Sequence, residues 1–233
     1  ARVTICDNTF TNSPFGPGFY DVSNSKLLFS GNRGLNVTYG YGSISGYQSL
    51  FKTSGLLPST VYITYNDFQV NRGATAVVLA DFGTVSTLRA VVSGNVFQTD
   101  TSYGGYFPTE PLYYSVIISY SLKSIVVSHN TILGGGSAGV YVVGGPGVIS
   151  ENVILGSNVG VWLDYATGMH VTANMIMNSA QWGIALTGES SNNLVARNLV
   201  KNSGQFDLYW DGTGSGNVWI RNLFQTSSPP GLR

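Results

Sequence analysis

The chain has 233 residues, of which only 9% are charged, with 11 basic (Lys plus Arg) and 11 acidic side chains, whereas an ordinary soluble domain has about 25% charged residues. This balance excludes a basic field that would recruit nucleic acid and an acidic field that would recruit cations. The single Cys6 excludes an internal disulfide and a Cys-based zinc cluster. No apolar run approaches the ~20 residues of a membrane-spanning helix. Ser, Thr, Asn, Gly and Tyr must supply most of the wetted surface, which predicts an exported protein that lies outside the cell or on its surface.

One motif recurs along the whole chain: a β-branched or apolar residue, two variable positions, Asn, one variable position and an apolar residue. Its asparagines are Asn8, Asn32, Asn66, Asn95, Asn130, Asn152, Asn174, Asn198 and Asn222. From Asn130 onward they are separated by 22, 22, 24 and 24 residues, which is too short for a propeller blade at about 40–45 residues and typical of one β-helical coil. An Asn amide at a tight corner can bond to the same Asn one coil away, at about 4.8 Å. We therefore predict that the nine asparagines form a structural ladder.

In the N-terminal half the spacings widen to 34, 29 and 35 residues between Asn32 and Asn130, so each coil there must expel about ten residues as a loop. The predicted insertions are residues 39–59, 81–87 and 99–114. Two of them are rich in aromatic side chains, namely Tyr39, Tyr41, Tyr47, Phe51, Tyr103, Tyr106, Phe107, Tyr113 and Tyr114. These rings either pack the loops onto the coils, bind a polysaccharide or surface glycan, or contact a partner protein. The same half contains one glycosylation sequon, at Asn36.

In the C-terminal half each coil carries a second apolar stretch, at residues 139–142, 160–163, 183–186 and 207–210. Two or three short strands per coil follow, with alternate side chains pointing inward and outward. Gly or Asn at the junctions would permit the positive-φ corners that such coils need.

These features resemble the right-handed parallel β-helix repeat family, of pectin-lyase-like fold, most clearly over residues 128–230. The resemblance implies an all-β, single-stranded parallel β-helix of about nine coils. The chain would be one domain, with irregular coils and long loops over residues 1–127 and regular coils with a closing loop over residues 128–233. The family includes carbohydrate-active enzymes and many secreted or surface proteins, so the fold alone does not choose an activity.

Two acidic residues are candidates for catalysis. Asp164 and Asp211 occupy equivalent positions after the second apolar stretch, two coils apart with Thr187 between them. Two coils measure about 9.6 Å, at the outer limit of the carboxyl separation in glycoside hydrolases. The alternative is that these acids, with the nearby Asp207 and Glu189, cap strand ends.

The residues before the later anchor asparagines form a predicted surface row of His129, Glu151, Ala173, Arg197 and Arg221. Within it, His129 and Glu151 would be adjacent across coils, either as a surface ion pair or as an acid–base couple. The sequence contains no zinc, phosphate-loop or calcium-repeat motif, so we expect no metal and no cofactor.

The leading functional hypothesis is an extracellular or cell-surface scaffold, structural or glycan-binding, that can be a subunit of a larger assembly. The main alternative is a polysaccharide lyase, hydrolase or epimerase with its groove beside the aromatic loops, and a third is a filament or layer subunit. Asn8 leaves little room for an N-terminal cap, so we expect self-association or an upstream domain to cover that end.

Overall fold

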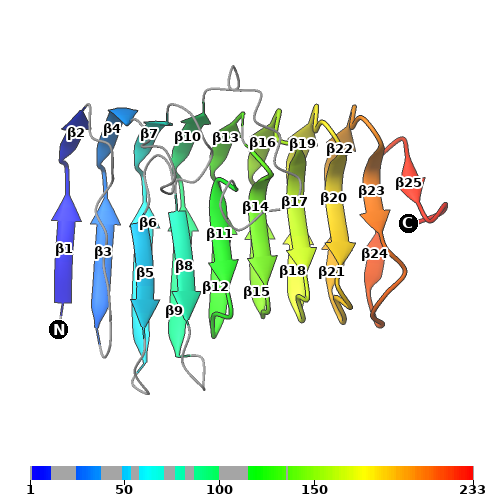
Figure 1. Ribbon diagram of the computed structural model, residues 1–233, viewed down its shortest axis with the longest axis horizontal. Helices are drawn as coiled ribbons and strands as arrows, with labels where there is room; N and C mark the ends of the chain where they lie inside the picture. The colour runs from blue at the N-terminus through cyan, green and yellow to red at the C-terminus, as the bar shows by residue number, and fades with distance from the viewer. Residues whose placement is uncertain are drawn as a thin grey trace.

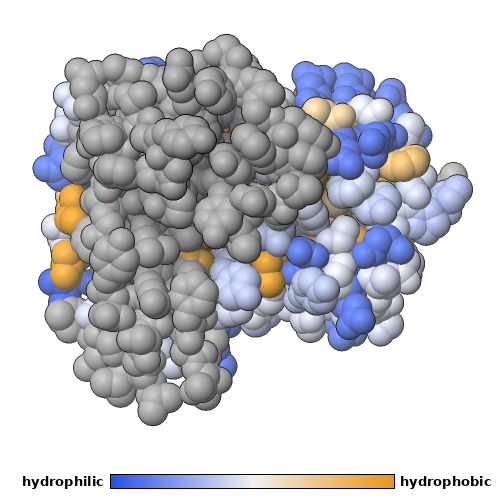
Figure 2. Space-filling model, viewed as in Figure 1, coloured by the Kyte–Doolittle hydropathy of each residue, from blue (hydrophilic) through white to orange (hydrophobic). Residues whose placement is uncertain are grey.

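The computed structural model describes residues 2–11, 25–37, 49–53, 58–70, 77–81, 87–99, 115–134 and 136–232. The described residues form β-strands and no helix. The strands stack along one long axis from the N-terminal to the C-terminal end (Figure 1). In the same view, hydrophilic side chains cover much of the described surface toward the C-terminal end (Figure 2).

Sheet A contains one strand from each successive coil, and every neighbouring pair is parallel. Its strands are β1 (Arg2–Cys6), β3 (Lys26–Ser30), β6 (Ser59–Thr64), β9 (Leu88–Ser93), β12 (Ser124–Ser128), β15 (Gly147–Ser150), β18 (Met169–Thr172), β21 (Leu194–Ala196) and β24 (Val218–Ile220).

Sheet B follows sheet A after a two-residue corner in every coil except that of the last sheet A strand, and it consists of short strands. Its strands are β2 (Thr9–Thr11), β4 (Arg33–Val37), β7 (Asp67–Val70), β10 (Val96–Thr99), β13 (Thr131–Leu133), β16 (Val153–Leu155), β19 (Met175–Met177) and β22 (Leu199–Lys201).

Sheet C completes the coils and is also parallel throughout. Its strands are β5 (Ser49–Thr53), β8 (Val77–Asp81), β11 (Ile117–Tyr120), β14 (Ala138–Val143), β17 (Val159–Asp164), β20 (Trp182–Thr187), β23 (Phe206–Trp210) and β25 (Ser227–Ser228). Three strands per coil agree with the prediction of two or three.

The core lies inside the stack and is built from the inward residue of each alternating strand. In sheet B these inward residues include Phe68 and Phe97, whose ring centroids are 5.9 Å apart. Phe68 also packs on the inward Phe29 of sheet A, with 6.0 Å between the ring centroids. Toward the C-terminal end, branched aliphatic residues such as Ile132 and Ile154 take over the same position. Because every coil repeats the inward positions, the apolar side chains form one continuous core.

At the corner between sheets A and B, the prediction that Gly or Asn adopts the positive φ is correct at Gly31 (φ 66) and Gly94 (φ 68) but wrong in other coils. Here the residue before the anchor Asn is left-handed, for example His129 (φ 55), Glu151 (φ 56) and Ala173 (φ 56). This conformation costs a non-glycine residue about 1 kcal/mol or more, and the hydrogen bonds of the following Asn offset that cost. At the corner between sheets B and C the prediction is correct, because Gly156 and Asn178 have positive φ there.

The predicted insertion over residues 39–59 is wrong in part, because it contains β5. This strand pairs in parallel with β8, with Phe51 opposite Leu79. The range 39–59 is longer than the roughly ten extra residues of this coil, because it includes the third strand that closes the coil.

Candidate functional site

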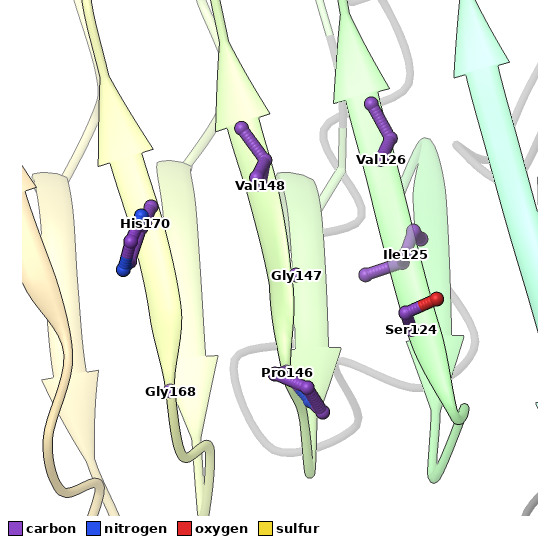
Figure 3. Close-up of a pocket in the computed structure, with 8 residues that line it drawn as sticks. All are labelled: Ser124, Ile125, Val126, Pro146, Gly147, Val148, Gly168 and His170. Atoms are coloured by element: carbon purple, nitrogen blue, oxygen red, sulfur yellow. The ribbon is translucent and has the colours of Figure 1, made fainter.

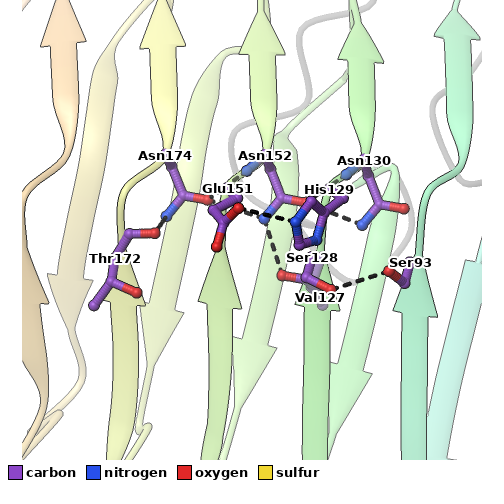
Figure 4. Close-up of polar contacts among 9 residues, drawn as sticks. All are labelled: Ser93, Val127, Ser128, His129, Asn130, Glu151, Asn152, Thr172 and Asn174. Carbon is purple, nitrogen blue, oxygen red and sulfur yellow. Dashed lines mark hydrogen bonds and ion pairs between the residues drawn. The ribbon is translucent and has the colours of Figure 1, made fainter.

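The anchor asparagines lie in one row along the corner between sheets A and B (Figure 4). Asn152 Nδ2 donates to Asn174 Oδ1 and to the carbonyl of Val127, both at 2.9 Å. Its Oδ1 accepts from the backbone N and the Nδ2 of Asn130, both at 3.0 Å. The same Asn-to-Asn bonds run from Asn8 to Asn222. These amides are engaged with one another, so the row acts in folding and offers no ligand site.

His129 and Glu151 are adjacent on the outside of this corner, with 2.9 Å between His129 Nε2 and Glu151 Oε2 (Figure 4). Their side chains are 60% and 58% exposed. An exposed pair of this kind contributes little to stability, and its geometry is that of a surface ion pair.

The outward face of sheet C carries a run of aromatic side chains, which we call the aromatic row: Tyr141, Trp162, Trp182, Phe206 and Tyr209. Trp162 packs edge-on against Tyr141 and Trp182, with centroids 5.4 Å and 6.1 Å away. Trp182 stacks flat on Tyr209, at 4.1 Å with an interplanar angle of 2°. The row therefore crosses four successive coils.

The row depends on a small residue in the sheet beneath it. Trp162 lies opposite Ala185 in the register of β17 and β20, while Trp182 lies opposite Val159. Ala185 is fully buried, and its single methyl group leaves room for the two indoles to meet diagonally. Edge-to-face and offset-stacked rings are the favoured aromatic geometries, so the rings form a defined surface.

A hydrogen-bonded chain borders the row where the strands of sheet C end. Trp162 Nε1 donates to Thr187 Oγ1 at 2.8 Å, and Thr187 Oγ1 donates to Asp164 Oδ1 at 2.7 Å. The Tyr141 hydroxyl donates to Asp164 Oδ2 at 2.9 Å. Burial, and then the charge of Asp164, raises the pKa of Tyr141 above its usual range, so the phenol remains a donor. Asp164 therefore holds two of the aromatic rings in place.

Asp211 lies at the same end of sheet C as Asp164, two coils further on, with Thr187 in the coil between them. Its carboxylate accepts from the backbone N of Gly188 at 2.9 Å, and from the backbone N and Oγ1 of Thr213 at 2.8 and 2.6 Å. Asp211 is exposed, and its bonds to Thr213 are those of an Asx turn. Both carboxylates are engaged locally, and the assignment of Asp164 and Asp211 to catalysis stays a prediction.

Side-chain amides border the opposite end of the same strands. Asn158 Nδ2 donates to Gln181 Oε1 at 3.4 Å, and Gln181 Nε2 donates to Gln205 Oε1 at 3.5 Å. These residues directly precede Val159, Trp182 and Phe206 in the chain. The buried Trp182 Nε1 has no hydrogen-bond acceptor in the described structure. The aromatic row thus runs between an amide border and a carboxylate–hydroxyl border.

A shallow depression of about 280 Å³ lies on sheet A, between the outward side chains of Val126, Val148 and His170 (Figure 3). Gly147, which also lines it, has no room for a side chain, because a Cβ there would meet the carbonyl of Ile125. Among the described residues no group of three or more His, Cys, Asp or Glu side chains could hold a metal ion. We assign this depression no chemistry.

The loop aromatics predicted to bind a glycan or partner all lie outside the described residues: Tyr39, Tyr41, Tyr47, Tyr103, Tyr106, Tyr113 and Tyr114. The side chain of the sequon residue Asn36 also lies outside them. None of the sequence predictions includes the aromatic row, although its signal is present in the sequence. Tyr141, Trp162 and Tyr209 stand at the alternate, outward position of the second apolar stretches.

A family model described as "Right handed beta helix region" matches residues 58–224. The chain belongs to this right-handed β-helix family, which confirms the predicted fold class. The chain has about nine coils, and they follow the pectin-lyase-like architecture of a parallel β-helix.

Among solved structures the chain is similar to the Dettilon tailspike protein (gp208), with a TM-score of 0.47 and 12% identity. The match covers 95% of this chain and 54% of that one, so the chain spans about half the length of the tailspike chain. A comparison with curated proteins gave no significant match. In the described part of the chain, no helix is long and apolar enough to cross a membrane.

Proposed function

We propose that the protein is an extracellular or cell-surface β-helix scaffold that binds a glycan on the aromatic row of sheet C. The observation that carries this proposal is the run of half-buried aromatic side chains with polar borders on both sides: Trp162, Trp182, Phe206 and Tyr209, with the buried Tyr141 packed at one end of the run. A pyranose presents C–H groups on one face and hydroxyls around its edge. The C–H groups suit the negative face of an aromatic ring, and amides and carboxylates suit the hydroxyls.

The charge of this face favours a neutral glycan. In β11, β14, β17, β20 and β23 no outward side chain is basic, whereas Asp164 and Asp211 stand at the strand ends. A polymer of uronic acids or sulfated sugars would meet like charge and no cation there. A neutral chain running along the stack could contact one coil after another.

The loop tyrosines extend this proposal. Residues 38–48 connect β4 to β5, and residues 100–116 connect β10 to β11, so both segments join sheet B to sheet C. The amide border of the aromatic row lies at the same corner of later coils. This shared corner supports a role for Tyr39, Tyr41, Tyr47, Tyr103, Tyr106, Tyr113 and Tyr114 in binding the same glycan.

Binding to a panel of neutral and acidic polysaccharides tests the proposal, with the ligand that is retained then titrated by calorimetry. We expect Trp182→Ala to weaken binding at least tenfold, because it removes the ring that contacts both Trp162 and Tyr209. Tyr65→Ala is the matched control, since Tyr65 is 73% exposed at another corner. Equal binding by the wild type and a folded Trp182→Ala protein would refute the proposal.

A second candidate function is a polysaccharide lyase, hydrolase or epimerase, which is favoured by the position of Asp164 and Asp211 beside the aromatic row. Incubation with the retained glycan, followed by assays for reducing ends and unsaturated sugars, separates the two functions. Turnover that is lost in both Asp164→Asn and Asp211→Asn, with binding retained, would establish the enzyme.

A further inference from the structure

The outward face of sheet B is unusually apolar toward the C-terminal end. One outward position, repeated coil by coil, is occupied by Thr131, Val153, Met175, Leu199 and Leu223. A second outward position is occupied by Leu133, Leu155, Met177 and Lys201. Met175 is 40% exposed and Leu223 is 60% exposed. We call these two rows the sheet B face.

The core does not account for these side chains, because the inward position of the same strands is already filled. Ile132, Ile154, Ile176 and Val200 occupy it and are fully buried. Strands that are apolar on both sides are typical of sheets with both faces covered. A continuous exposed apolar patch on a soluble protein marks an interaction surface.

The charges beside this face suggest what covers it. At the corner between sheets A and B, Glu151, Ala173 and Arg197 occupy three successive coils, about 4.8 Å apart. Arg197 forms no ion pair in the described structure, while Glu151 contacts His129 of its own chain through Oε2 and keeps a side chain that is 58% exposed. Glu151 and Arg197 thus lie one coil before and one coil after the small Ala173. A second copy with its stack reversed would place an acid opposite each base, so the pattern is self-complementary.

A two-fold axis through the coil of Ala173, parallel to the strands, exploits this pattern. Rotation about this axis reverses the direction of the stack in the second copy. Glu151 of one copy then faces Arg197 of the other, and Arg197 of the first copy faces Glu151 of the second. The same operation places Val153 opposite Leu199 of the other copy. Met175 meets its own equivalent at the axis, where its flexible side chain can adapt to close contact.

We propose that two copies of this chain associate antiparallel through the sheet B face, in an isologous dimer centred on Met175 and Ala173. The apolar rows supply the buried surface and the two Glu151–Arg197 pairs select the register. Sheet C points away from this interface, so the dimer presents two aromatic rows.

Sedimentation velocity over a concentration series tests the dimer with the folded chain. We expect the wild type to change from the 24.8 kDa monomer to twice that mass with rising concentration. Met175→Glu should raise the dissociation constant at least tenfold, because it places two charges at the axis. Circular dichroism of each variant verifies that the fold is intact.

A charge exchange tests the register. Glu151→Arg and Arg197→Glu should each weaken the dimer at least tenfold through like charges, and the double variant should restore it to within about threefold. Arg89→Glu, on the exposed outward side of sheet A, is the matched control and should leave the dimer unchanged. Both Glu151 and Arg197 positions already hold long side chains at positive φ, so the exchange suits the backbone.

Four outcomes would overturn the proposal. A strict monomer at all concentrations, or a Met175→Glu protein that associates like the wild type, would exclude the sheet B face. A double variant that stays monomeric would exclude the antiparallel register. A trimer or filament would exclude the two-fold arrangement.

Discussion

At the scale of single residues, Tyr141 is the side chain that joins the aromatic row to its polar border. Its ring packs against Trp162 and its hydroxyl donates to Asp164. Only 3% of Tyr141 is exposed. Burial first, and the negative charge of Asp164 second, raise the pKa of the phenol, so the native state resists its ionisation.

This pKa shift predicts a loss of stability at alkaline pH. The unfolded chain releases the Tyr141 proton at about pH 10, whereas the native protein keeps it. The stabilisation is therefore complete below pH 10 and is lost as pH rises above it, by up to about 1.4 kcal/mol per pH unit.

Urea unfolding of the wild type and Tyr141→Phe, from pH 8 to pH 11.5, measures this effect. Below pH 10 the wild type should be more stable by about 2 kcal/mol, the worth of a hydrogen bond to a charged group. Above pH 10 this difference should shrink, because only the wild type carries the Tyr141 proton. Two curves that remain parallel throughout would contradict the assignment.

At the scale of elements, Asp207 attaches the last segment of the chain to β23. Its Oδ1 accepts from the backbone N of Ser203 at 3.0 Å, and its Oδ2 accepts from the backbone N of Gln225 at 2.8 Å and of Thr226 at 3.3 Å. The carboxylate is 1% exposed. The role of Asp207 is therefore structural. This role agrees with the alternative in the sequence predictions that such acids cap strand ends.

Asp207→Asn should lower the free energy of unfolding by about 3 kcal/mol, because an amide nitrogen would face backbone N–H groups. Amide hydrogen exchange at Gln225 and Thr226 should accelerate more than in the distant coils. Asp211→Asn, at an exposed carboxylate in the next turn, serves as the control with little effect. Unchanged exchange at Gln225 would show that β25 is held by other contacts.

At the scale of the whole molecule, the asparagine ladder couples each coil to its neighbours. Stability in such a stack is close to a sum of coil and interface contributions. Each interior asparagine accepts from the coil before and donates to the coil after, whereas Asn222 accepts from Asn198 and donates only to the backbone of Val195. The position of a substitution along the stack should therefore decide its cost.

Asn152→Ala should destabilise the protein by about 4 kcal/mol, because it leaves the buried backbone N of Asn130 without an acceptor, removes one of the two acceptors of Asn130 Nδ2, and leaves Val127 O without this donor. Asn222→Ala, at a half-buried position that water can reach, should cost about 1 kcal/mol. Urea unfolding of both variants measures the difference. Equal losses would mean that the ladder does not distinguish interior from end.

The sequence by itself determined the class of fold and the stacking of coils. Asn152 and Asn174 could be placed in neighbouring coils because the motif around each is local and its period matches a known unit. The pairing of Asp164 with Thr187 followed in the same way, since both end the same strand of successive coils. These inferences need only spacing and alternation.

Only the tertiary structure decided which surfaces exist. Trp162 and Trp182 are 20 residues apart in the sequence, and their contact depends on the register between β17 and β20 and on the small side chain of Ala185. The third strand β5, within a segment assigned to a loop, likewise depends on pairing with β8. Contacts between coils are set by register and by side-chain volume across the sheet, and neither quantity is contained in the local pattern of one repeat.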